Sequence, residues 1–370
     1  MNIGLDLTPI IYHRGVSRYT ANLTKALTQR ADVKVAGFGY SLRQHFELRN
    51  MIRQLGVTEF EVQNRPQSLM QLQWQLGLNP IKKILPKIDV FHSWDWLQPP
   101  DKDLPLVSTI HDVAMLKYPD TAHPKILRMH RRSWKTLRQR QAQIIAVSRT
   151  TKNDIVNLLG IPKYQVHVVH EALPVEFKEV SENLTEEQVV ATKDRFNLTK
   201  PYLLFVGTRE PRKNLSRLIE AWRPLAKDYE LIIAGEPGWD DTATMKQSNL
   251  RFLGKVSDQD LAVLYGEADL FCFPSLYEGF GLPILEAFYH GTPVVTSNVS
   301  SMPEVAGNAA ELVNPEDVSS IRAGIEKVLN EDLAAQKKRL QQMIIRLQMF
   351  GWERVAEETV KVYQQALNEQ

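Results

Sequence analysis

Two glutamates separated by seven residues form the part of this chain best suited to chemistry on a small polar ligand. Glu278 and Glu286 flank the segment Gly279-Phe280-Gly281-Leu282-Pro283-Ile284-Leu285. On one unbroken helix the two residues would lie roughly 12 Å apart along the axis, which is too far to serve one small ligand easily. The glycines permit a loop that exposes amide groups, and Pro283 suits the first turn of a helix. The segment therefore predicts a strand, a glycine loop and a helix N-terminus, which together favour anion binding.

A second candidate cluster is basic and follows the apolar run Tyr202–Val206. The segment from Gly207 to Leu215, which contains Thr208, Arg212 and Lys213, opens a helix predicted to continue through Trp222. Cations at a helix entrance are unfavourable for the helix dipole but well placed to hold a bound diphosphate. Arg212 can fork onto phosphate oxygens, and Lys213 can act as a point charge, while Arg209 is a weaker candidate. The alternative is a solvated basic turn.

The glutamate pair and its surroundings resemble the two-glutamate motif of the retaining glycosyltransferases of family four, of the bacterial polysaccharide or glycolipid type. The similarity includes the runs 268–275, 290–295 and 303–307. It implies the GT-B fold, which consists of two doubly wound Rossmann-like α/β domains facing a central cleft. The resemblance further implies that residues 1–175 form an N-terminal acceptor-side domain, onto which a C-terminal helix 351–370 crosses back, and that residues 176–350 form the domain that binds the nucleotide sugar. The alternative is two surface glutamates beside an ordinary turn.

The resemblance also implies roles for individual residues. Arg212 and Lys213 stabilise the leaving diphosphate, Glu278 contacts hydroxyls of the transferred sugar, and His111 contacts the donor sugar, so these four residues are the catalytic candidates. Glu286 accepts hydrogen bonds from ribose hydroxyls, for which an ionised carboxylate is suited. The remaining donor-binding candidates lie in loops near these positions: Gly15, Asp112, Thr208, Val256, Gly279, Phe280, Gly281 and Leu282.

Three candidates lie in the N-terminal half. His111 and Asp112 directly follow the strand-like run Leu106–Ile110, which places them at the carboxyl edge of a sheet, with Asp112 orienting the loop or the imidazole. Gly15 lies in the loop His13-Arg14-Gly15 before a helix predicted from Thr20 to Leu27. Arg14 replaces one glycine of the commoner double-glycine form, and no G-x-G-x-x-G occurs, which argues against a nicotinamide or flavin enzyme.

Composition limits the functional classes. With 45 basic and 43 acidic residues, the net charge of +2 gives no reason to expect nucleic acid as a partner. The single cysteine, Cys272, excludes an intramolecular disulfide and fits a reducing cytoplasm. The N-terminus enters a strand-like run at once and no apolar stretch of about 18 residues occurs, so we expect neither signal peptide nor membrane span. Asp101-Lys102-Asp103 lies among prolines, and we expect no metal and no cofactor besides the donor.

Apolar runs alternate with helical periodicity along the chain, the pattern of parallel sheets with crossover helices. Two sets of strands are predicted, separated by a polar linker near residues 172–198; the alternative there is an exposed capping helix. The strands are 3–7, 33–38, 90–92, 106–110, 144–147 and 166–169 in the first set, and 202–206, 231–234, 250–253, 270–273, 294–296 and 310–313 in the second. The amphipathic segment 352–367 predicts a closing helix.

One further segment carries a local charge excess. Residues 127–140 contain many basic residues and no acidic one, interleaved with Leu, Met and Trp. Such a helix can lie peripherally on an anionic membrane or hold a lipid-diphosphate acceptor, while a solvated surface is the commoner explanation.

The sequence therefore predicts a cytoplasmic, metal-independent, retaining hexosyltransferase. Its expected donor is a nucleoside diphosphate sugar, UDP-glucose or a related UDP-hexose ahead of GDP-mannose, and its acceptor is a glycan or lipid-linked glycan. A GDP-mannose-dependent mannosyltransferase is the closest alternative. From other classes, a nucleotide-sugar epimerase or hydrolase and a catalytically silent GT-B protein that binds a glycan precursor remain open.

Overall fold

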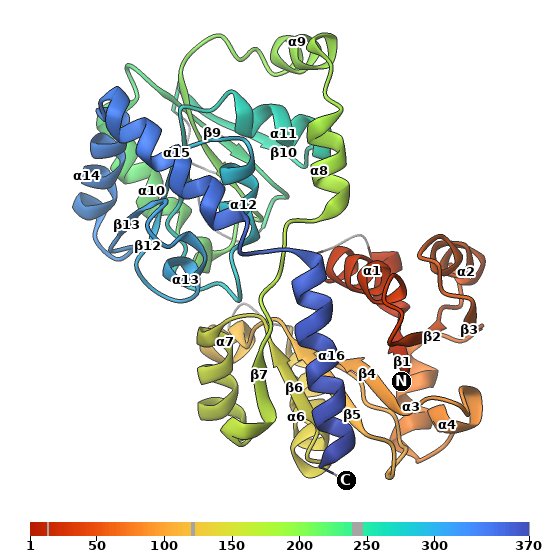
Figure 1. Ribbon diagram of the computed structural model, residues 1–370. Helices are drawn as coiled ribbons and strands as arrows, with labels where there is room; N and C mark the ends of the chain where they lie inside the picture. Colours follow the sequence, from red (N-terminus) through yellow and green to blue (C-terminus); the bar gives the residue numbers. More distant parts are fainter. Residues whose placement is uncertain (13–14, 120–122, 239–246, 370) are drawn as a thin grey trace. The chain divides into compact units, whose positions relative to one another are not determined.

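The computed structural model describes residues 1–12, 15–119, 123–238 and 247–369 and contains two compact units (Figure 1). Unit 1 comprises Met1–Pro174 and Trp352–Gln370, and unit 2 comprises Val175–Gly351. Every pair of neighbouring strands in either sheet is parallel, and helices connect most of the consecutive strands. Each unit is therefore a parallel α/β domain, as the alternation of apolar runs and helical periodicity predicts.

Unit 1 is built on a sheet with the strand order β3-β2-β1-β4-β5-β6-β7. Its strands are β1 (Asn2–Asp6), β2 (Lys34–Tyr40), β3 (Glu59–Gln63), β4 (Val90–Trp94), β5 (Leu106–Ile110), β6 (Gln143–Ala146) and β7 (Val166–Val168). The helices before β7 are η1 (Thr8–Tyr12), α1 (Gly15–Thr28), α2 (His45–Gln54), α3 (Gln67–Gln75), α4 (Ile81–Ile84), α5 (Ala114–Lys117), α6 (Pro124–Gln139), α7 (Arg149–Asp154), η3 (Ile155–Leu159) and η4 (Lys163–Gln165).

The central strands β4 and β5 of unit 1 were predictable because they are buried throughout and mostly apolar, as is typical of a parallel sheet covered on both faces. The edge strand β3 was not predicted. Its sequence contains Glu59 and Glu61, which are exposed, and only Val62 is buried. An edge strand needs few apolar side chains because one of its sides faces water.

The last helix of the chain, α16 (Trp352–Asn368), belongs to unit 1 and packs against α1, β4, β5 and β6 (Figure 1). Its buried residues recur at helical spacing, and the Tyr363 hydroxyl lies 2.7 Å from Nδ1 of the buried His92. Burial lowers the pKa of His92 to about 3, so its ring is neutral at ordinary pH. The imidazole therefore serves as a hydrogen-bonding part of the core.

Unit 2 has the strand order β10-β9-β8-β11-β12-β13. Its strands are β8 (Tyr202–Val206), β9 (Glu230–Ala234), β10 (Leu250–Gly254), β11 (Leu270–Phe273), β12 (Val294–Ser297) and β13 (Glu311–Val313). Its helices are α8 (Val175–Glu182), α9 (Glu186–Arg195), η5 (Pro211–Lys213), α10 (Leu215–Trp222), η6 (Arg223–Leu225), α11 (Asp258–Gly266), α12 (Leu282–Tyr289), α13 (Met302–Ala306), α14 (Val318–Leu329) and α15 (Leu333–Leu347). The strand order reverses between β8 and β11, and such a switch point is where open parallel sheets bind ligands.

The predicted linker near residues 172–198 is wrong, and the alternative of a helix there is correct. Helices α8 and α9 occupy most of this segment and pack on α11. Helix α9 begins with a capping box, in which Thr185 accepts from the Gln188 N–H and the Gln188 side chain accepts from the Thr185 N–H. Most of its residues are exposed, which explains why the segment lacks a compact apolar pattern.

Within the described residues, no helix combines the length and the apolar character that crossing a bilayer requires.

Candidate functional site

Two loops meet at the carboxyl ends of β8 and β11 in unit 2. The β8 loop leads through η5 to Asn214, whose backbone is left-handed with φ of 61°. The Asn214 side chain donates to the carbonyl oxygens of Pro274 and Pro315 at 3.0 and 2.7 Å, and Leu276 N–H donates to Arg212 O at 2.7 Å. These bonds hold the basic loop against the segment that follows β11.

This contact brings three of the predicted catalytic residues together. Arg212 Nη1 lies 2.9 Å from Glu278 Oε2, and Lys213 Nζ lies 2.6 Å from Glu278 Oε1. The other side of the Arg212 guanidinium binds Glu210 at 2.8 Å. The side chains of Glu278, Lys213 and Arg212 are only 10%, 11% and 17% exposed, so the cluster is shielded from water and its charges interact strongly.

The charges of the Glu278 cluster are balanced, with two cations and two carboxylates. Burial by itself raises the pKa of Glu278, but Lys213 and Arg212 outweigh it and the net pKa lies below the usual value. Glu278 is therefore ionised near neutral pH. A bound diphosphate would compete with Glu278 and Glu210 for the same two cations, and could free the Glu278 carboxylate to accept from hydroxyl groups.

The backbone of Glu278 is fixed by two serines that the sequence analysis missed. Ser300 Oγ accepts from Glu278 N–H at 3.1 Å and donates to Glu278 O at 2.8 Å, and Ser301 Oγ donates to the same oxygen at 3.0 Å. Both serines follow β12, and Ser300 has a φ of 58°. Their position after the end of a strand could have identified them, because residues at the carboxyl ends of parallel strands commonly form the ligand site. The β8 loop was identified in the same way.

The second glutamate, Glu286, lies within α12 in a different environment. The buried Tyr265 hydroxyl donates to Glu286 Oε2 at 2.9 Å, and the residue is 7% exposed. Burial and the Glu286 charge raise the pKa of Tyr265 well above its usual value, so the tyrosine stays a donor. Tyr265 therefore orients the carboxylate whose proposed partners are ribose hydroxyls.

The remaining predicted donor-binding residues of unit 2 lie in the strand-end loops or at the start of α12. Thr208 and Val256 are half-buried in the loops after β8 and β10, and Gly279 is half-buried beside Glu278. Gly281 directly precedes α12 with φ of 115°, a conformation that glycine adopts without strain, and Leu282 is the first residue of the helix. Phe280 is buried and packs edge-on against Phe350, and this contact anchors the glycine loop 279–281.

His111 follows β5 in unit 1, as predicted, and its ring is held on several sides. Nδ1 lies 2.7 Å from Glu171 Oε1, the Tyr19 ring packs edge-on at 4.8 Å between centroids, and Trp94 stacks at 6.2 Å. Nε2 is buried and has no hydrogen-bond partner among the described residues. Burial lowers the pKa of His111, but Glu171, with Asp95 and Asp112, raises it to a net value above the usual one. The predicted contact of His111 with a donor sugar stays a prediction.

For Asp112 the structure agrees with the first of the two predicted alternatives, orienting the loop or the imidazole, while the helix at Gly15 starts earlier than predicted. Asp112 Oδ1 accepts from Ala114 N–H at 2.8 Å, so Asp112 fixes the loop, while Glu171 rather than Asp112 binds the imidazole. Gly15 is the first residue of α1, which starts five positions before the predicted Thr20. His13 and Arg14 lie outside the described residues. Glu171 was missed, although its position just after β7 was a usable signal.

Among the residues that the structure describes, no group of three or more histidine, cysteine, aspartate or glutamate side chains is arranged to hold a metal ion. Asp101 accepts from the N–H groups of Ile81 and Lys82 at 2.7 and 2.8 Å. This aspartate therefore caps the start of α4.

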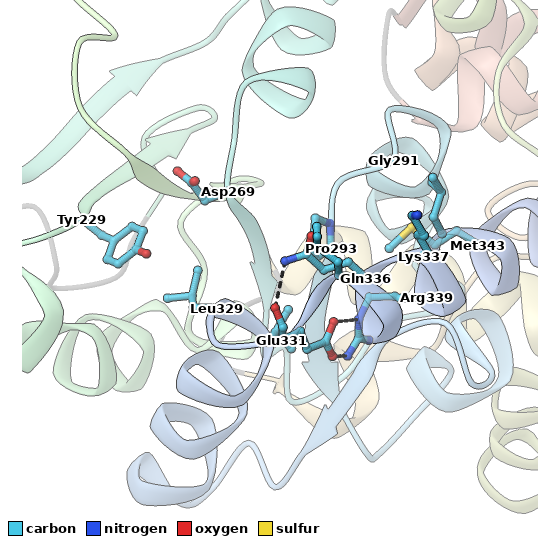
Figure 2. A pocket seen from close by; sticks show the side chains of 13 residues that line it. Tyr229, Asp269, Gly291, Pro293, Leu329, Glu331, Gln336, Lys337, Arg339 and Met343 are labelled. Atoms are coloured by element: carbon cyan, nitrogen blue, oxygen red, sulfur yellow. Dashed lines mark hydrogen bonds and ion pairs between the residues drawn. The ribbon is translucent and has the colours of Figure 1, made fainter.

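A cavity of about 430 Å³ lies elsewhere in unit 2 and includes none of the predicted site residues (Figure 2). Three of its lining residues, Tyr229, Asp269 and Pro293, directly precede β9, β11 and β12, which places the cavity at the amino ends of the strands. Figure 2 shows its one buried cation, Arg339, paired with Glu331. Its chemistry is thus separate from that of the Glu278 cluster.

Comparison with known proteins gives two family matches that together span most of the chain. The model described as Glycosyltransferase Family 4 matches residues 13–177, and the model described as Glycosyl transferases group 1 matches residues 188–346. These matched ranges correspond to most of unit 1 and unit 2, respectively.

Individual relatives agree with these matches. The O-antigen chain mannosyltransferase B of Escherichia coli is 34% identical over 232 residues, which are 60% of this chain and 60% of that protein. The first curated relatives are matched over only about a quarter to 60% of their own length.

Two solved structures share the fold. The glycosyltransferase of Rickettsia africae ESF-5 has a TM-score of 0.73 at 16% identity, covering 100% of this chain and 99% of that one. The Anabaena protein Alr3699/HepE in complex with UDP and glucose has a TM-score of 0.69 at 16% identity, covering 99% and 100%. At this identity the similarity establishes the fold alone. With both family matches in place and the GT-B architecture shared, the chain belongs to glycosyltransferase family 4.

Proposed function

We propose that the chain is a retaining mannosyltransferase that moves a mannosyl unit from GDP-mannose to a hydroxyl of a glycan or lipid-linked glycan. The observation that carries this proposal is the buried cluster of Glu278, Arg212 and Lys213 at the switch point of unit 2. It offers two cations for a diphosphate and an ionised carboxylate for sugar hydroxyls on neighbouring atoms.

In the proposed reaction, Arg212 and Lys213 stabilise the negative charge that develops on the departing nucleoside diphosphate. The bond between the sugar carbon and the diphosphate oxygen breaks, and the acceptor oxygen forms a new bond to that carbon from the same face. The departing phosphate oxygen takes the acceptor proton. Retention of configuration is inferred from the family.

The nucleotide would be held by groups around the cluster. Glu286, oriented by Tyr265, would accept from the ribose hydroxyls. The backbone near Gly279 and Gly281 would approach the sugar and phosphates, and that near Val256 would contact the base. Positive charge from Arg212 and Lys213 takes the part that a divalent metal has in other transferases, so we propose that catalysis needs no metal.

The choice of donor follows the relatives. The Escherichia coli relative at 34% identity is described as a mannosyltransferase, which supports a mannosyl donor ahead of UDP-glucose. UDP-glucose is the second candidate, since the Anabaena protein of the same fold is described in complex with UDP and glucose. The two donors differ in base and sugar, so one panel of donors separates them.

The test measures nucleoside diphosphate release from GDP-mannose, UDP-glucose and related donors in excess chelator, with and without glycan acceptors. We expect release from GDP-mannose that is strongly reduced in Glu278→Gln. Glu326→Gln changes an exposed carboxylate on α14 of the same unit and is the matched control. Free mannose without acceptor would indicate a hydrolase, and binding of GDP without turnover on any donor and acceptor would indicate a silent binding protein.

A further inference from the structure

The near-neutral charge of the whole chain conceals a strong asymmetry between its two units. The sequence of unit 1 has 26 lysines and arginines and 17 aspartates and glutamates, a net charge of +9. The sequence of unit 2 has 19 basic and 26 acidic residues, a net charge of −7. Such a charge asymmetry within one chain favours contact of the cationic unit with an anionic partner.

Much of this positive charge is concentrated on α6. The helix has six basic residues and no acidic one, and all six are exposed: Lys125, Arg128, Arg131, Arg132, Lys135 and Arg138. Its opposite face buries Trp134 and Leu137 in the core of unit 1, together with His130, which pairs with Asp95 at 3.2 Å. The helix is therefore fixed in place by its apolar side while its cations point outward.

A groove runs between α6 and α3. It consists of two adjoining cavities of about 390 and 420 Å³, which share Gln71, Met129 and Arg132. No carboxylate occurs among the described residues that line either cavity, whereas five cations do: Lys102, Lys125, Arg128, Arg132 and Arg140. Trp96, Ile126 and Met129 provide apolar surface in the same groove. This combination suits a phosphate group that is attached to an apolar body.

Helix α3, which contributes other residues to the groove, also carries exposed leucines that line neither cavity. Leu69, Leu72 and Leu76 follow each other at spacings of three and four residues and are 39%, 53% and 63% exposed, and Leu78 just beyond the helix is 54% exposed. Residues at these spacings lie on one face of a helix. Apolar side chains next to a row of cations are characteristic of surfaces that lie in the interface of a bilayer.

We propose that this α3–α6 face, defined by the six cations of α6 and the four leucines at 69, 72, 76 and 78, docks on a bilayer that contains anionic phospholipids. The cations contact lipid phosphates, the groove receives one phosphate headgroup, and the leucines enter the boundary with the acyl chains. The exposed leucines favour a lipid surface over a nucleic acid, for which cations alone would suffice. This inference is independent of the donor chemistry of unit 2.

The test is co-sedimentation of the full chain, without donor, with vesicles of phosphatidylcholine alone or of phosphatidylcholine mixed with the anionic lipid phosphatidylglycerol. We expect binding to the anionic vesicles only. The double variant Arg128→Glu/Arg132→Glu should lower the partition coefficient on the order of tenfold or more. The double variant Leu72→Ser/Leu76→Ser should also bind the anionic vesicles more weakly. Its remaining binding then depends on the cations alone and should be lost in high salt.

Matched controls keep the result specific. Lys83→Glu/Lys87→Glu makes the same change of charge at exposed positions elsewhere in unit 1, and Leu158→Ser removes an exposed leucine outside the face. Both should bind like the parent chain. Three outcomes would each overturn the proposal. The first two are an equal loss of binding in both charge-reversed variants and equal binding to neutral and anionic vesicles. The third is full inhibition of vesicle binding by millimolar free phosphate, which would indicate a small-anion site.

Discussion

The half-buried His111 pairs with the buried Glu171 at the carboxyl edge of the unit 1 sheet, with 2.7 Å between Nδ1 and Oε1. The carboxylate fixes which ring nitrogen faces the protein, and Tyr19 and Trp94 restrict the ring plane. Nε2 is left without a hydrogen-bond partner among the described residues. Glu171 is thus a positioning residue for the histidine that the sequence singled out.

Glu171→Gln should lower the pKa of His111, because glutamine can still accept a hydrogen bond from Nδ1 but carries no negative charge. Glu171 raises the folded-state pKa of His111 above the usual 6.5, so its stabilising effect is fully present below pH 6.5 and is lost as the pH rises through the folded value. The stability difference between parent and variant should therefore shrink toward alkaline pH. Histidine NMR titration and thermal melting between mildly acidic and alkaline pH measure both effects.

Glu353→Gln on α16 removes an exposed carboxylate from the same unit and serves as the control for charge alone. It should leave the pKa of His111 unchanged. A Glu171→Gln variant with the parent's histidine titration would contradict the assigned role of the pair.

Glu278→Gln should destabilise the ligand-free protein as well as reduce turnover. The variant leaves Arg212 and Lys213 close together without the buried carboxylate that neutralises them, and breaking such a pair costs about 3–5 kcal/mol. Because the cations lower the pKa of Glu278, its contribution is present above about pH 4.5 and is lost as the pH falls through the folded value. Urea unfolding against pH should show this acid loss in the parent chain and not in the variant.

Added diphosphate offers a second check on the Glu278 cluster. A ligand that supplies negative charge to Arg212 and Lys213 should restore more stability to Glu278→Gln than to the parent chain, which can be measured as the rise in melting temperature with GDP or UDP. Equal rises in both proteins would mean that the nucleotide does not bind at these cations.

Whether a feature of the structure could be predicted from the sequence depends on the kind of interaction that produces it. The runs Tyr202–Val206 and Leu270–Phe273 match β8 and β11 residue for residue, because buried strands of a parallel sheet need continuous apolar side chains. The grouping of Arg212, Lys213 and Glu278 was implied by the resemblance to family four, and the structure places the two loops after the adjacent strands β8 and β11. Their place after a strand end marks Glu171 and Ser300 as candidates, but it does not reveal their partners, which lie 60 and 22 positions away along the chain.

Ser300→Ala should loosen the loop that presents Glu278. The substitution removes two hydrogen bonds to the Glu278 backbone, each in a partly buried place, and should cost about 1–3 kcal/mol. The backbone φ of 58° at position 300 is strained for serine and alanine but not for glycine. Ser300→Gly should therefore lower the free energy of unfolding less than Ser300→Ala does. Chemical denaturation ranks the two variants, with Ser216→Ala on the exposed side of α10 as control.

A final prediction concerns Gly235, which directly follows β9 and lies against the start of the β8 loop. A Cβ atom at this position would lie 2.1 Å from the carbonyl oxygen of Gly207, and backbone cannot move aside as a flexible side chain can. Gly235→Ala should therefore displace the segment that leads to Arg212 and Lys213 and weaken nucleotide binding, which calorimetry with GDP measures. Gly254→Ala is the control for an added Cβ without the clash. Its φ of 71° is also positive, although the 151° of Gly235 is still less accessible to alanine, and no atom of the described residues lies within 4 Å of the added Cβ. Gly254→Ala should cost only the backbone strain, about 1–2 kcal/mol, with binding retained. If both variants lost binding equally, strain rather than the contact between the loops after β8 and β9 would be responsible, and the position of the basic loop would not depend on Gly235.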